Sequence, residues 1–415
     1  MLQRKVHSIG PDPDLARVTR DRKQFDWSRK FSAQGVRAAP SQIQELMKIL
    51  DRPGLISLAG GIPDAKLFPI AEIAAAHRRI LDDPKRSAAA LQYTHSEGFA
   101  PLREWLAGDW RRQGIDCGQE NILVTSGAQQ ALDLVARLFL DNGDRLLTAP
   151  TLYIGALQAF GNLAPAYGEL AELRQPQAPV AKLAYAMPDF ANPTGLSMDL
   201  DERRALLDGA EARNVVLVED GTYASLNYDG PPPASLMALS AGRSGAIDGA
   251  RVIYCGTFSK SLAPGLRVGW IVAPAPVIRR LVLLKQASDL YTSLLAQMVL
   301  LEVVCNLGDA HGETLRRTYR PRRDAMLSAL SKHMPAGVHW TKPGGGMFVW
   351  LTLPLEFHAK ELCRRGLEEE NLAFIPGSAF YAKSPRRNTV RLSFCLNDPE
   401  TNAQGVERFG RLIAR

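Results

Sequence analysis

Four short polar segments could carry chemistry in this 415-residue chain, and each directly follows an apolar run. Apolar runs of this length are typical of buried strands, and the carboxyl ends of parallel strands meet at the edge of a sheet where α/β proteins bind ligands. We therefore expect backbone amides, a carboxylate, a phenol and a lysine amine to lie together along this edge of the sheet, which we call the rim. A lysine amine there can form a covalent bond with a carbonyl carbon and can move a proton. The segments are residues 126–130 (SGAQQ), 188–195 (PDFANPTG), 219–223 (EDGTY) and 256–260 (GTFSK).

Strands and helices that alternate along the chain must position these segments. Amphipathic stretches such as residues 128–140 and 200–213 separate the apolar runs, which predicts an α/β fold with a mostly parallel central sheet and flanking helices. Beyond residue 275, a long helical stretch to about residue 330 precedes a different pattern. A glycine-rich strand, a helix near 359–370 and a strand at 390–394 predict a smaller α+β domain. The predicted strands of the central sheet are residues 121–125, 145–148, 182–187, 215–218, 251–255 and 268–272.

The composition excludes several classes of protein. Hydrophobic residues make up 46% and charged residues 22%, which is typical of a globular chain and not of a disordered one. No apolar stretch reaches the roughly 18 residues of a membrane span. The net charge of +7 is small for this length and suits small anions, so we expect no nucleic-acid partner. Five scattered cysteines indicate a reducing, cytoplasmic setting, and the seven histidines show no metal-ligand spacing.

Residues 256–269 (GTFSKSLAPGLRVG) give the most specific motif. This stretch resembles the lysine segment of fold-type I aminotransferases, which use pyridoxal 5'-phosphate (PLP). The motif at 192–195 (NPTG), the pair Asp220 and Tyr223, and the motif at 391–394 (RLSF) extend the resemblance over nearly the whole chain. The 2-aminoadipate, kynurenine and aromatic amino acid branch is similar at further segments. These are residues 56–63 (ISLAGGIP), 68–69 (FP), 91–93 (LQY) and 345–348 (GGMF).

The resemblance implies three parts of the chain. Residues 1–55 would form an N-terminal arm and a mobile helix that belongs to the small domain, with helical periodicity from 38 to 50. Residues 56–310 would form the large PLP-binding domain, and residues 311–415 the C-terminal small domain. The segment between residues 161 and 182 is shorter than the family pattern, so a strand–helix excursion of the large domain would be trimmed there.

The resemblance also implies roles for the residues that act on the cofactor ring. Lys260 would hold PLP as a Schiff base and then move the Cα proton. Asp220 would keep the pyridine nitrogen protonated, so that the ring acts as an electron sink. Tyr223 and Asn192 would donate hydrogen bonds to the phenolic oxygen. Tyr153 would stack on the ring, although a core tyrosine at a helix start would look the same in the sequence.

A phosphate group requires amides at a helix start and a cation. The family usually has a serine where this chain has Ala128, so one side-chain hydrogen bond to the phosphate would be missing. Tyr93 matches a tyrosine that reaches the phosphate of the neighbouring subunit, which implies a homodimer with composite active sites. The other residues expected at the phosphate are Gly127, Gln129, Thr257, Ser259 and Arg267.

For the substrate, Arg391 matches the arginine that binds the α-carboxylate in a bidentate fork. Gly61 fits a loop where the backbone approaches the substrate closely, and Asn192 would also contact it. Arg37 lies where relatives that use 2-aminoadipate place an arginine for a side-chain carboxylate. A solvated charge at a helix start explains Arg37 equally well.

The resemblance therefore implies ping-pong transfer of an amino group from an L-amino acid to a 2-oxo acid through pyridoxamine phosphate. The donor would be 2-aminoadipate, an aromatic or kynurenine-like amino acid, or a branched aliphatic one, with glutamate as partner. Two alternatives stay open. One is another PLP reaction, such as β-elimination, decarboxylation or racemisation. The other is an aminotransferase-like regulator that senses an effector, although only about 50 residues precede Ile56, too few for a winged-helix domain.

Overall fold

The computed structural model describes residues 25–37, 52–230 and 232–414. The chain divides into two compact units, residues 1–39 and 40–415. Within the first unit, a 3₁₀ helix (η1, Trp27–Lys30) precedes α1 (Ala33–Arg37). The helix expected at 38–50 lies outside the described residues.

Among the described residues, the larger sheet has seven strands in the order β2-β8-β7-β6-β5-β3-β4. Strand β8 runs antiparallel to both neighbours, and every other pair is parallel, which confirms the predicted mostly parallel sheet. The edge strand β4 was not predicted, because its four residues are exposed or half-buried and form no apolar run. The strands are β2 (Ile122–Thr125), β3 (Arg145–Thr148), β4 (Ala166–Glu169), β5 (Leu183–Ala186), β6 (Val216–Asp220), β7 (Val252–Thr257) and β8 (Gly269–Val272).

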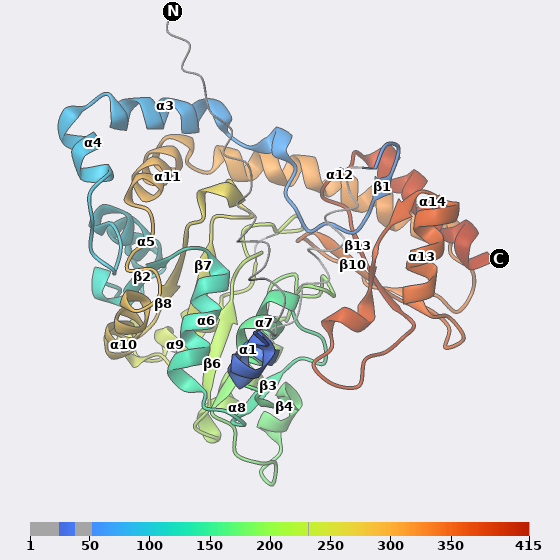
Figure 1. Ribbon diagram of the computed structural model, residues 1–415, viewed down its shortest axis with the longest axis horizontal. Helices are drawn as coiled ribbons and strands as arrows, with labels where there is room; N and C mark the ends of the chain where they lie inside the picture. Colours follow the sequence, from blue (N-terminus) through green and yellow to red (C-terminus); the bar gives the residue numbers. More distant parts are fainter. Residues whose placement is uncertain (1–24, 38–51, 231, 415) are drawn as a thin grey trace, which may run out of the picture. The chain divides into compact units, whose positions relative to one another are not determined.

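Helices cover both faces of this sheet (Figure 1). One face packs against α5 (Ala100–Arg112), α8 (Leu200–Ala212) and α9 (Leu236–Gly242). The other face packs against α6 (Ala128–Phe139), α7 (Ile154–Gly161) and α10 (Ala275–Gln286). Neighbouring strand residues such as Leu217 and Val218 therefore enter different cores. Burial on both faces explains why these strands read as continuous apolar runs.

The C-terminal part contains a smaller antiparallel sheet in the order β12-β13-β10-β9, and β1 pairs with β11 in parallel. Helix α12 lies alongside α14, next to β10 and β13 (Figure 1). Strand β1 begins at Ile56, the first residue of the expected large domain, yet its partner β11 lies near residue 372. These elements are β1 (Ile56–Ser57), β9 (His339–Trp340), β10 (Phe348–Thr352), β11 (Leu372–Ala373), β12 (Ile375–Pro376), β13 (Thr389–Ser393), α12 (Ala310–His333), α13 (Ala359–Glu369) and α14 (Pro399–Ala414).

The single long helical stretch predicted from 276 to about 330 is wrong. The structure divides it into α10, α11 (Leu294–Leu307) and α12. Leu290 and Gly308 lie at the two breaks with φ of 64° and 51°, which a continuous right-handed helix does not allow. Ser293 caps α11 by accepting a hydrogen bond from the amide of Ala296.

The remaining helices surround these layers. Helix α3 (Ile70–Leu81) lies beside α11 and leads into α4 (Pro84–Ala90) (Figure 1). Across the described ranges, no helix alone has the length and hydropathy of a membrane span. Helices α11 and α12 satisfy that test only as a pair bent by 81°. Short 3₁₀ helices are η2 (Ala65–Leu67), η3 (Gln119–Asn121), η4 (Leu170–Arg174), η5 (Ile247–Gly249), η6 (Pro264–Leu266) and η7 (Gly377–Phe380).

Candidate active site

The carboxyl ends of β2, β3, β5, β6 and β7 lie at one edge of the large sheet, because these strands all run in the same direction. The predicted site residues follow directly. Asp220 is the last residue of β6, and the others lie in the turns after their strands. Those residues are Gly127 after β2, Tyr153 after β3, Asn192 after β5, Tyr223 after β6 and Lys260 after β7.

Lys260 projects from the turn after β7 toward the loop that follows β1. Its Nζ donates a hydrogen bond to the carbonyl oxygen of Gly61 at 2.8 Å. Burial lowers the pKa of Lys260 to about 8, and the charges of Arg391 and Arg267 act in the same direction. A Cβ on Gly61 would lie 2.6 Å from the ring of Phe348, so only glycine allows this close approach. The amine is therefore neutral, and so nucleophilic, at a lower pH than an exposed lysine.

Asp220 is a buried carboxylate that is 1% exposed. Its Oδ2 accepts a hydrogen bond from the hydroxyl of Tyr185 at 2.8 Å. Its Oδ1 accepts from the amide and hydroxyl of Thr222, at 3.1 and 2.5 Å. Burial raises the pKa of Asp220, while these hydrogen bonds act against the rise. Within the described part of the chain Asp220 has no basic partner, so it is a carboxylate prepared for a cationic group of a ligand.

Arg391 extends from the middle of β13 and is 1% exposed. Its Nη1 donates to Oδ1 of Asn192 at 2.8 Å, and its Nη2 donates to the carbonyl of Ala59 at 2.7 Å. The guanidinium carbon lies 4.2 Å from the ring centroid of Phe348 and 4.9 Å from that of Phe380. Burial lowers the pKa of Arg391 to about 10.

No acidic group among the described residues pairs with Arg391, and its Nε has no hydrogen-bond partner there. A buried charge without a counter-charge is strongly unfavourable. A ligand carboxylate would supply both the counter-charge and the missing acceptor. Arg391 therefore has the chemistry of an anion-binding site.

Asn192 connects Arg391 to Tyr223. Its Nδ2 donates to the Tyr223 hydroxyl over a long 3.5 Å, while its Oδ1 accepts from Arg391. Burial raises the pKa of Tyr223, so the phenol is protonated at neutral pH and can donate a hydrogen bond. The Tyr223 ring meets Phe348 edge-on at 5.7 Å.

The turn before α6 has the form of an anion site. Gly127 has φ of 90°, and a Cβ there would lie 2.7 Å from Nη2 of Arg267. The first amides of α6, beginning with Ala128, have no acceptor within the helix. Arg267 itself has φ of 54° and donates from Nη2 to the carbonyl of Ser126 at 2.9 Å. The turn therefore offers amides and a guanidinium side by side.

Three other predicted phosphate residues occupy different positions around this turn. Thr257 and Ser259 are linked by their hydroxyls at 2.9 Å in the segment that leads to Lys260. Gln129 instead donates from Nε2 to the carbonyl of Gly155 at 2.8 Å, so its side chain holds the start of α7.

Tyr153 is the N-cap residue of α7 and is half-buried at the margin of two cores. Burial raises its pKa, and so does the nearby charge of Asp220, while Arg267 and Arg391 act in the opposite direction. Tyr153 thus lies within electrostatic reach of three rim residues. Its ring also lies against Gly155, where a Cβ would come within 2.4 Å of Cε1.

One predicted residue, Tyr93, does not belong to this cluster, and another, Arg37, belongs to the other compact unit. Tyr93 lies in the loop between α4 and α5, is 75% exposed, and has its ring 6.0 Å from that of Tyr291. Arg37 is the last residue of α1 in the unit formed by residues 1–39, where its surface is exposed.

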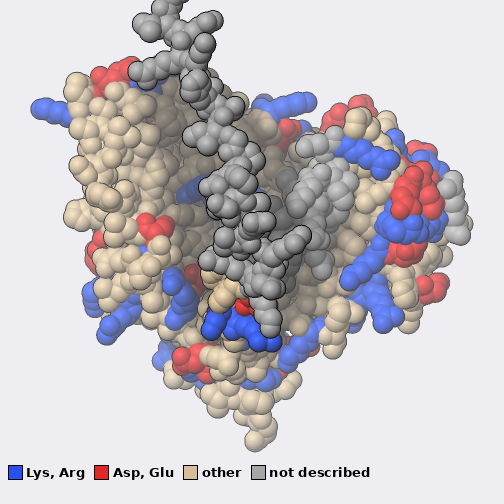
Figure 2. Space-filling view, in the orientation of Figure 1, with Lys and Arg blue, Asp and Glu red and all other residues tan. Residues whose placement is uncertain are grey.

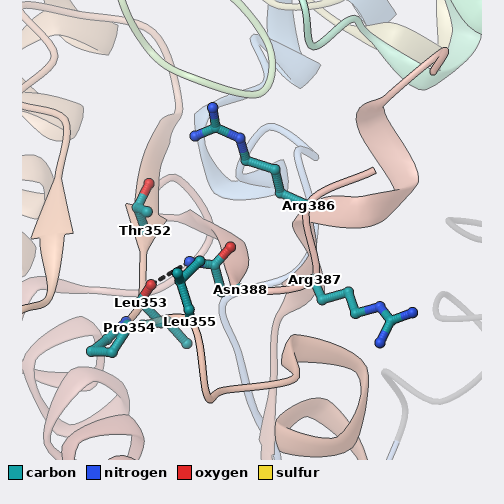
Figure 3. A pocket seen from close by; sticks show the side chains of 7 residues that line it. All are labelled: Thr352, Leu353, Pro354, Leu355, Arg386, Arg387 and Asn388. Carbon is teal, nitrogen blue, oxygen red and sulfur yellow. Dashed lines mark hydrogen bonds between the residues drawn. The ribbon is translucent and has the colours of Figure 1, made fainter. Parts of the chain in front are cut away.

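A separate hollow of about 660 Å³ lies at the far end of β10. Its lining includes Thr352, Leu353, Leu355 and Asn388, and the side chain of Asn388 donates a hydrogen bond to the carbonyl of Leu353 (Figure 3). The side chain of Arg387 points away from Leu353 (Figure 3). On the face in Figure 2, basic side chains are spread over several elements with acidic ones among them. None of the predicted site residues lines the hollow.

Several residues that contact the side chains of Asp220 and Arg391 were not predicted from the sequence. Tyr185 lies in the apolar run of β5, and nothing in that run distinguishes its hydroxyl from a core side chain. Phe348 was noted only as part of a motif, and Phe380 was not noted at all. Thr222 was inside the quoted 219–223 segment, where a hydroxyl two residues after a carboxylate is a usable signal for a local hydrogen bond.

Comparisons with known proteins agree with this geometry. A model of the family "Aminotransferase class I and II" matches residues 178–409. The chain is 41% identical to a 2-aminoadipate transaminase of Thermus thermophilus, over 94% of this chain and 98% of the relative. It is 38% identical to aromatic-amino-acid aminotransferase 1 of Thermococcus litoralis, over 94% of this chain and 95% of the relative.

A solved structure is similar over the same extent. The α-aminoadipate aminotransferase LysN of Thermus thermophilus, complexed with N-(5'-phosphopyridoxyl)-L-leucine, superposes with a TM-score of 0.84. It is 40% identical and covers 94% of this chain and 98% of its own. The predicted family, enzyme class and cofactor are confirmed by these matches. The chain belongs to the class I and II aminotransferases of fold type I, enzymes that use pyridoxal 5'-phosphate.

Proposed function

We propose that this aminotransferase transfers the amino group of a long-chain or aromatic L-amino acid to a 2-oxo acid, with Lys260, Asp220, Tyr223 and Arg391 as its central residues. The observation that carries the proposal is the buried guanidinium of Arg391, which has no acidic partner among the described residues and an Nε without an acceptor. The same rim holds the amine of Lys260 with a pKa of about 8.

The rim residues fit pyridoxal phosphate. Its aldehyde calls for a reactive amine, which Lys260 supplies, and its ring nitrogen calls for a carboxylate without a basic partner, which Asp220 supplies. Its phosphate calls for helix-start amides and a cation, which Gly127 and Arg267 frame. When bound, PLP supplies an electron sink for the bonds to the substrate Cα. The further residues proposed to hold it are Ala128, Gln129, Tyr153, Asn192, Thr257 and Ser259.

Each of these side chains has a separate role in the proposed reaction. Lys260, once its amine is free, moves the proton at the substrate Cα, and its lowered pKa suits it to act as a base near neutral pH. Asp220 would hold the ring nitrogen of the cofactor in its protonated form, and the donors from Tyr185 and Thr222 favour the ionised carboxylate that this role requires. Tyr223 and Asn192, which lie 3.5 Å apart through their hydroxyl and amide groups, would donate hydrogen bonds to the ring oxygen of the cofactor.

Arg391 decides between the reactions that PLP permits. A bidentate fork on the α-carboxylate retains that group and fixes the substrate, which favours transamination over decarboxylation. Gly61 leaves room for the substrate beside the Phe348 ring, and Asn192 orients the fork through its hydrogen bond to Nη1.

The relatives guide the choice of substrate. Their names refer to 2-aminoadipate and to aromatic amino acids, and the ligand in the similar structure carries a leucine moiety. We propose donors of these classes with glutamate and 2-oxoglutarate as the second pair, in a ping-pong sequence. Arg37 is proposed to meet the side-chain carboxylate of 2-aminoadipate.

We also propose a homodimer with composite active sites. The support is Tyr93, an aromatic side chain that is 75% exposed, with its neighbour Leu91 72% exposed. Such side chains are commonly covered in an assembly. We propose that each subunit consists of an N-terminal arm with a mobile helix (residues 1–55), a large domain (56–310) and a small domain (311–415).

The test is a half-reaction titration. The PLP-loaded protein receives one amino acid at a time without a 2-oxo acid, and the visible band of the bound cofactor is followed. We expect 2-aminoadipate, aromatic amino acids and glutamate to bleach the band, and 2-oxoglutarate to restore it. Bleaching by small amino acids alone would contradict the substrate class, and loss of carbon dioxide from the donor would contradict transamination.

A further inference from the structure

Lys285 is a fully buried lysine that the proposed reaction does not use. It lies on the same face of α10 as Ile278, Leu281 and Val282, which are apolar and enter the core beside α6. Its Nζ donates to both carboxylate oxygens of Asp289, at 2.7 and 2.9 Å, and to Oε1 of Gln130 at 3.1 Å. Lysine is rarely buried unless its amine is paired, and this amine has three acceptors, which indicates a structural role.

The partners of Lys285 both hold Ser126, the residue directly before Gly127. Asp289 Oδ2 accepts from the Ser126 hydroxyl at 3.0 Å, and Gln130 Oε1 accepts from the Ser126 amide at 2.7 Å. The Ser126 carbonyl accepts from Arg267 at 2.9 Å. The amide of Ser126 is thus fixed by a side chain of the adjoining helix α6, and its hydroxyl and carbonyl by side chains from distant parts of the chain.

The turn after α10 holds Asp289 in place. The carbonyl of Lys285 accepts hydrogen bonds from the amides of Ser288, Asp289 and Leu290, at 2.9, 3.1 and 3.2 Å. Leu290 adopts φ of 64° to close this turn. Since the backbone of Lys285 anchors the turn and its amine binds the carboxylate, the pair behaves as one rigid unit.

We propose that Lys285 and Asp289 form a positioning pair, which fixes Ser126 and thereby aims the amides of Gly127, Ala128 and Gln129 at the phosphate of PLP. The inference rests on the placement of the phosphate under the proposed function. Lys285 has a second effect, because it neutralises a carboxylate that would otherwise repel an anion bound at the same turn. The pair thus organises the turn without adding net charge to it.

Two neutral double variants separate positioning from charge. K285M/D289A removes the carboxylate that accepts from the Ser126 hydroxyl and leaves that hydroxyl, among the described residues, only the Thr292 hydroxyl at 3.2 Å. K285M/D289N removes the same charges and keeps an oxygen at residue 289 that can accept from the Ser126 hydroxyl. The cofactor is stripped, and the dissociation constant of added PLP is measured by absorbance. We expect the dissociation constant of PLP to rise about tenfold in K285M/D289A, which corresponds to the loss of one hydrogen bond to a charged group. For K285M/D289N we expect a dissociation constant within about threefold of the wild-type value.

Two further variants guard against effects on folding. S126A keeps the Lys285–Asp289 pair and is expected to weaken PLP binding by about tenfold, since it loses the same hydrogen bond from the Ser126 hydroxyl to the Asp289 carboxylate. E302Q is the control, because Glu302 pairs with Arg79 and Arg86 away from the turn. It should lower the melting temperature and leave PLP binding unchanged.

The ³¹P resonance of the bound phosphate gives a readout independent of activity, and it should shift in K285M/D289A but not in E302Q. Unchanged PLP binding in K285M/D289A and S126A, or equal losses in the two double variants, would overturn the inference alone. Failure of the wild-type chain to bind PLP would overturn the proposed function together with it.

Discussion

The Tyr185→Phe substitution removes a single hydroxyl from the carboxylate proposed to face the cofactor ring. That hydroxyl donates to Oδ2 of Asp220 at 2.8 Å, and both groups are buried. Thr222 keeps its two hydrogen bonds on Oδ1, so the carboxylate stays in place but loses its donor on one side. The phenylalanine ring fills the same space and keeps the edge-on contact with Phe160 at 5.5 Å.

The magnitude follows from the loss of one hydrogen bond to a charged group, about 1.5–3 kcal/mol. Because this donor stabilises the ionised carboxylate, its loss raises the pKa of Asp220 beyond the rise that burial already causes. If the smaller figure is expressed fully in the transition state, kcat falls about tenfold. KM for the amino acid should change little, since the Tyr185 hydroxyl bonds Asp220, whereas Arg391 bonds Asn192 and the Ala59 carbonyl.

The assay is kcat and KM as a function of pH. The sign is fixed by the carboxylate: a higher pKa for Asp220 means that its ionised form is lost earlier as pH falls. The acid limb of the kcat profile should therefore move to higher pH in Y185F. The control is Tyr228→Phe, which removes a buried hydroxyl from a neutral acceptor, the carbonyl of Gly346. An unchanged acid limb in Y185F, or an equal shift in both variants, would refute the reasoning.

Three other predictions address the rim. Arg391→Lys loses the bidentate fork and should lower kcat/KM by about a hundredfold while PLP binding stays the same, so weaker PLP binding with normal KM would count against its role. Burial lowers the pKa of Lys260 to about 8, so its neutral amine accumulates as pH rises through that value. The rate at which the stripped protein takes up PLP should therefore rise with pH, with a midpoint near 8. A midpoint near 10.5, the ordinary pKa of lysine, would contradict this prediction. Gly127→Ala forces a Cβ to within 2.7 Å of Arg267 and should weaken PLP binding at least about tenfold, whereas Gly143→Ala, at φ of 85° with open space around it, should cost stability only. Titration of PLP into both glycine variants checks this, and equal binding would refute the steric argument.

The sequence was sufficient to predict six of the seven described strands of the large sheet, because strands buried on both faces leave clear apolar runs, whereas the edge strand β4 leaves none. The polar residues after those runs followed from the rule that parallel strands end at one edge. The position of Asp220 at the end of β6 and of Lys260 after β7 therefore needed no knowledge of tertiary contacts. The resemblance then supplied roles that periodicity alone cannot.

Contacts between elements distant in the chain were not predictable in this way. Tyr185 reads as one more core residue, and only the pairing of β5 with β6 brings its hydroxyl to Asp220. Lys285 did leave a signal, because it occupies the position where the apolar stripe of α10 calls for a hydrophobic residue. The breaks at Leu290 and Gly308 were missed because helical periodicity continues on both sides of each.

The central claim is that Lys260 holds the cofactor, and the most direct measurement fixes the cofactor to its lysine. The PLP-loaded protein is reduced with borohydride, digested, and mapped by mass spectrometry, with Lys260→Ala treated in parallel. We predict one pyridoxyl group per chain, located on Lys260, and none in the variant. A label on another lysine, or an unlabelled wild-type chain that still transaminates, would contradict the account.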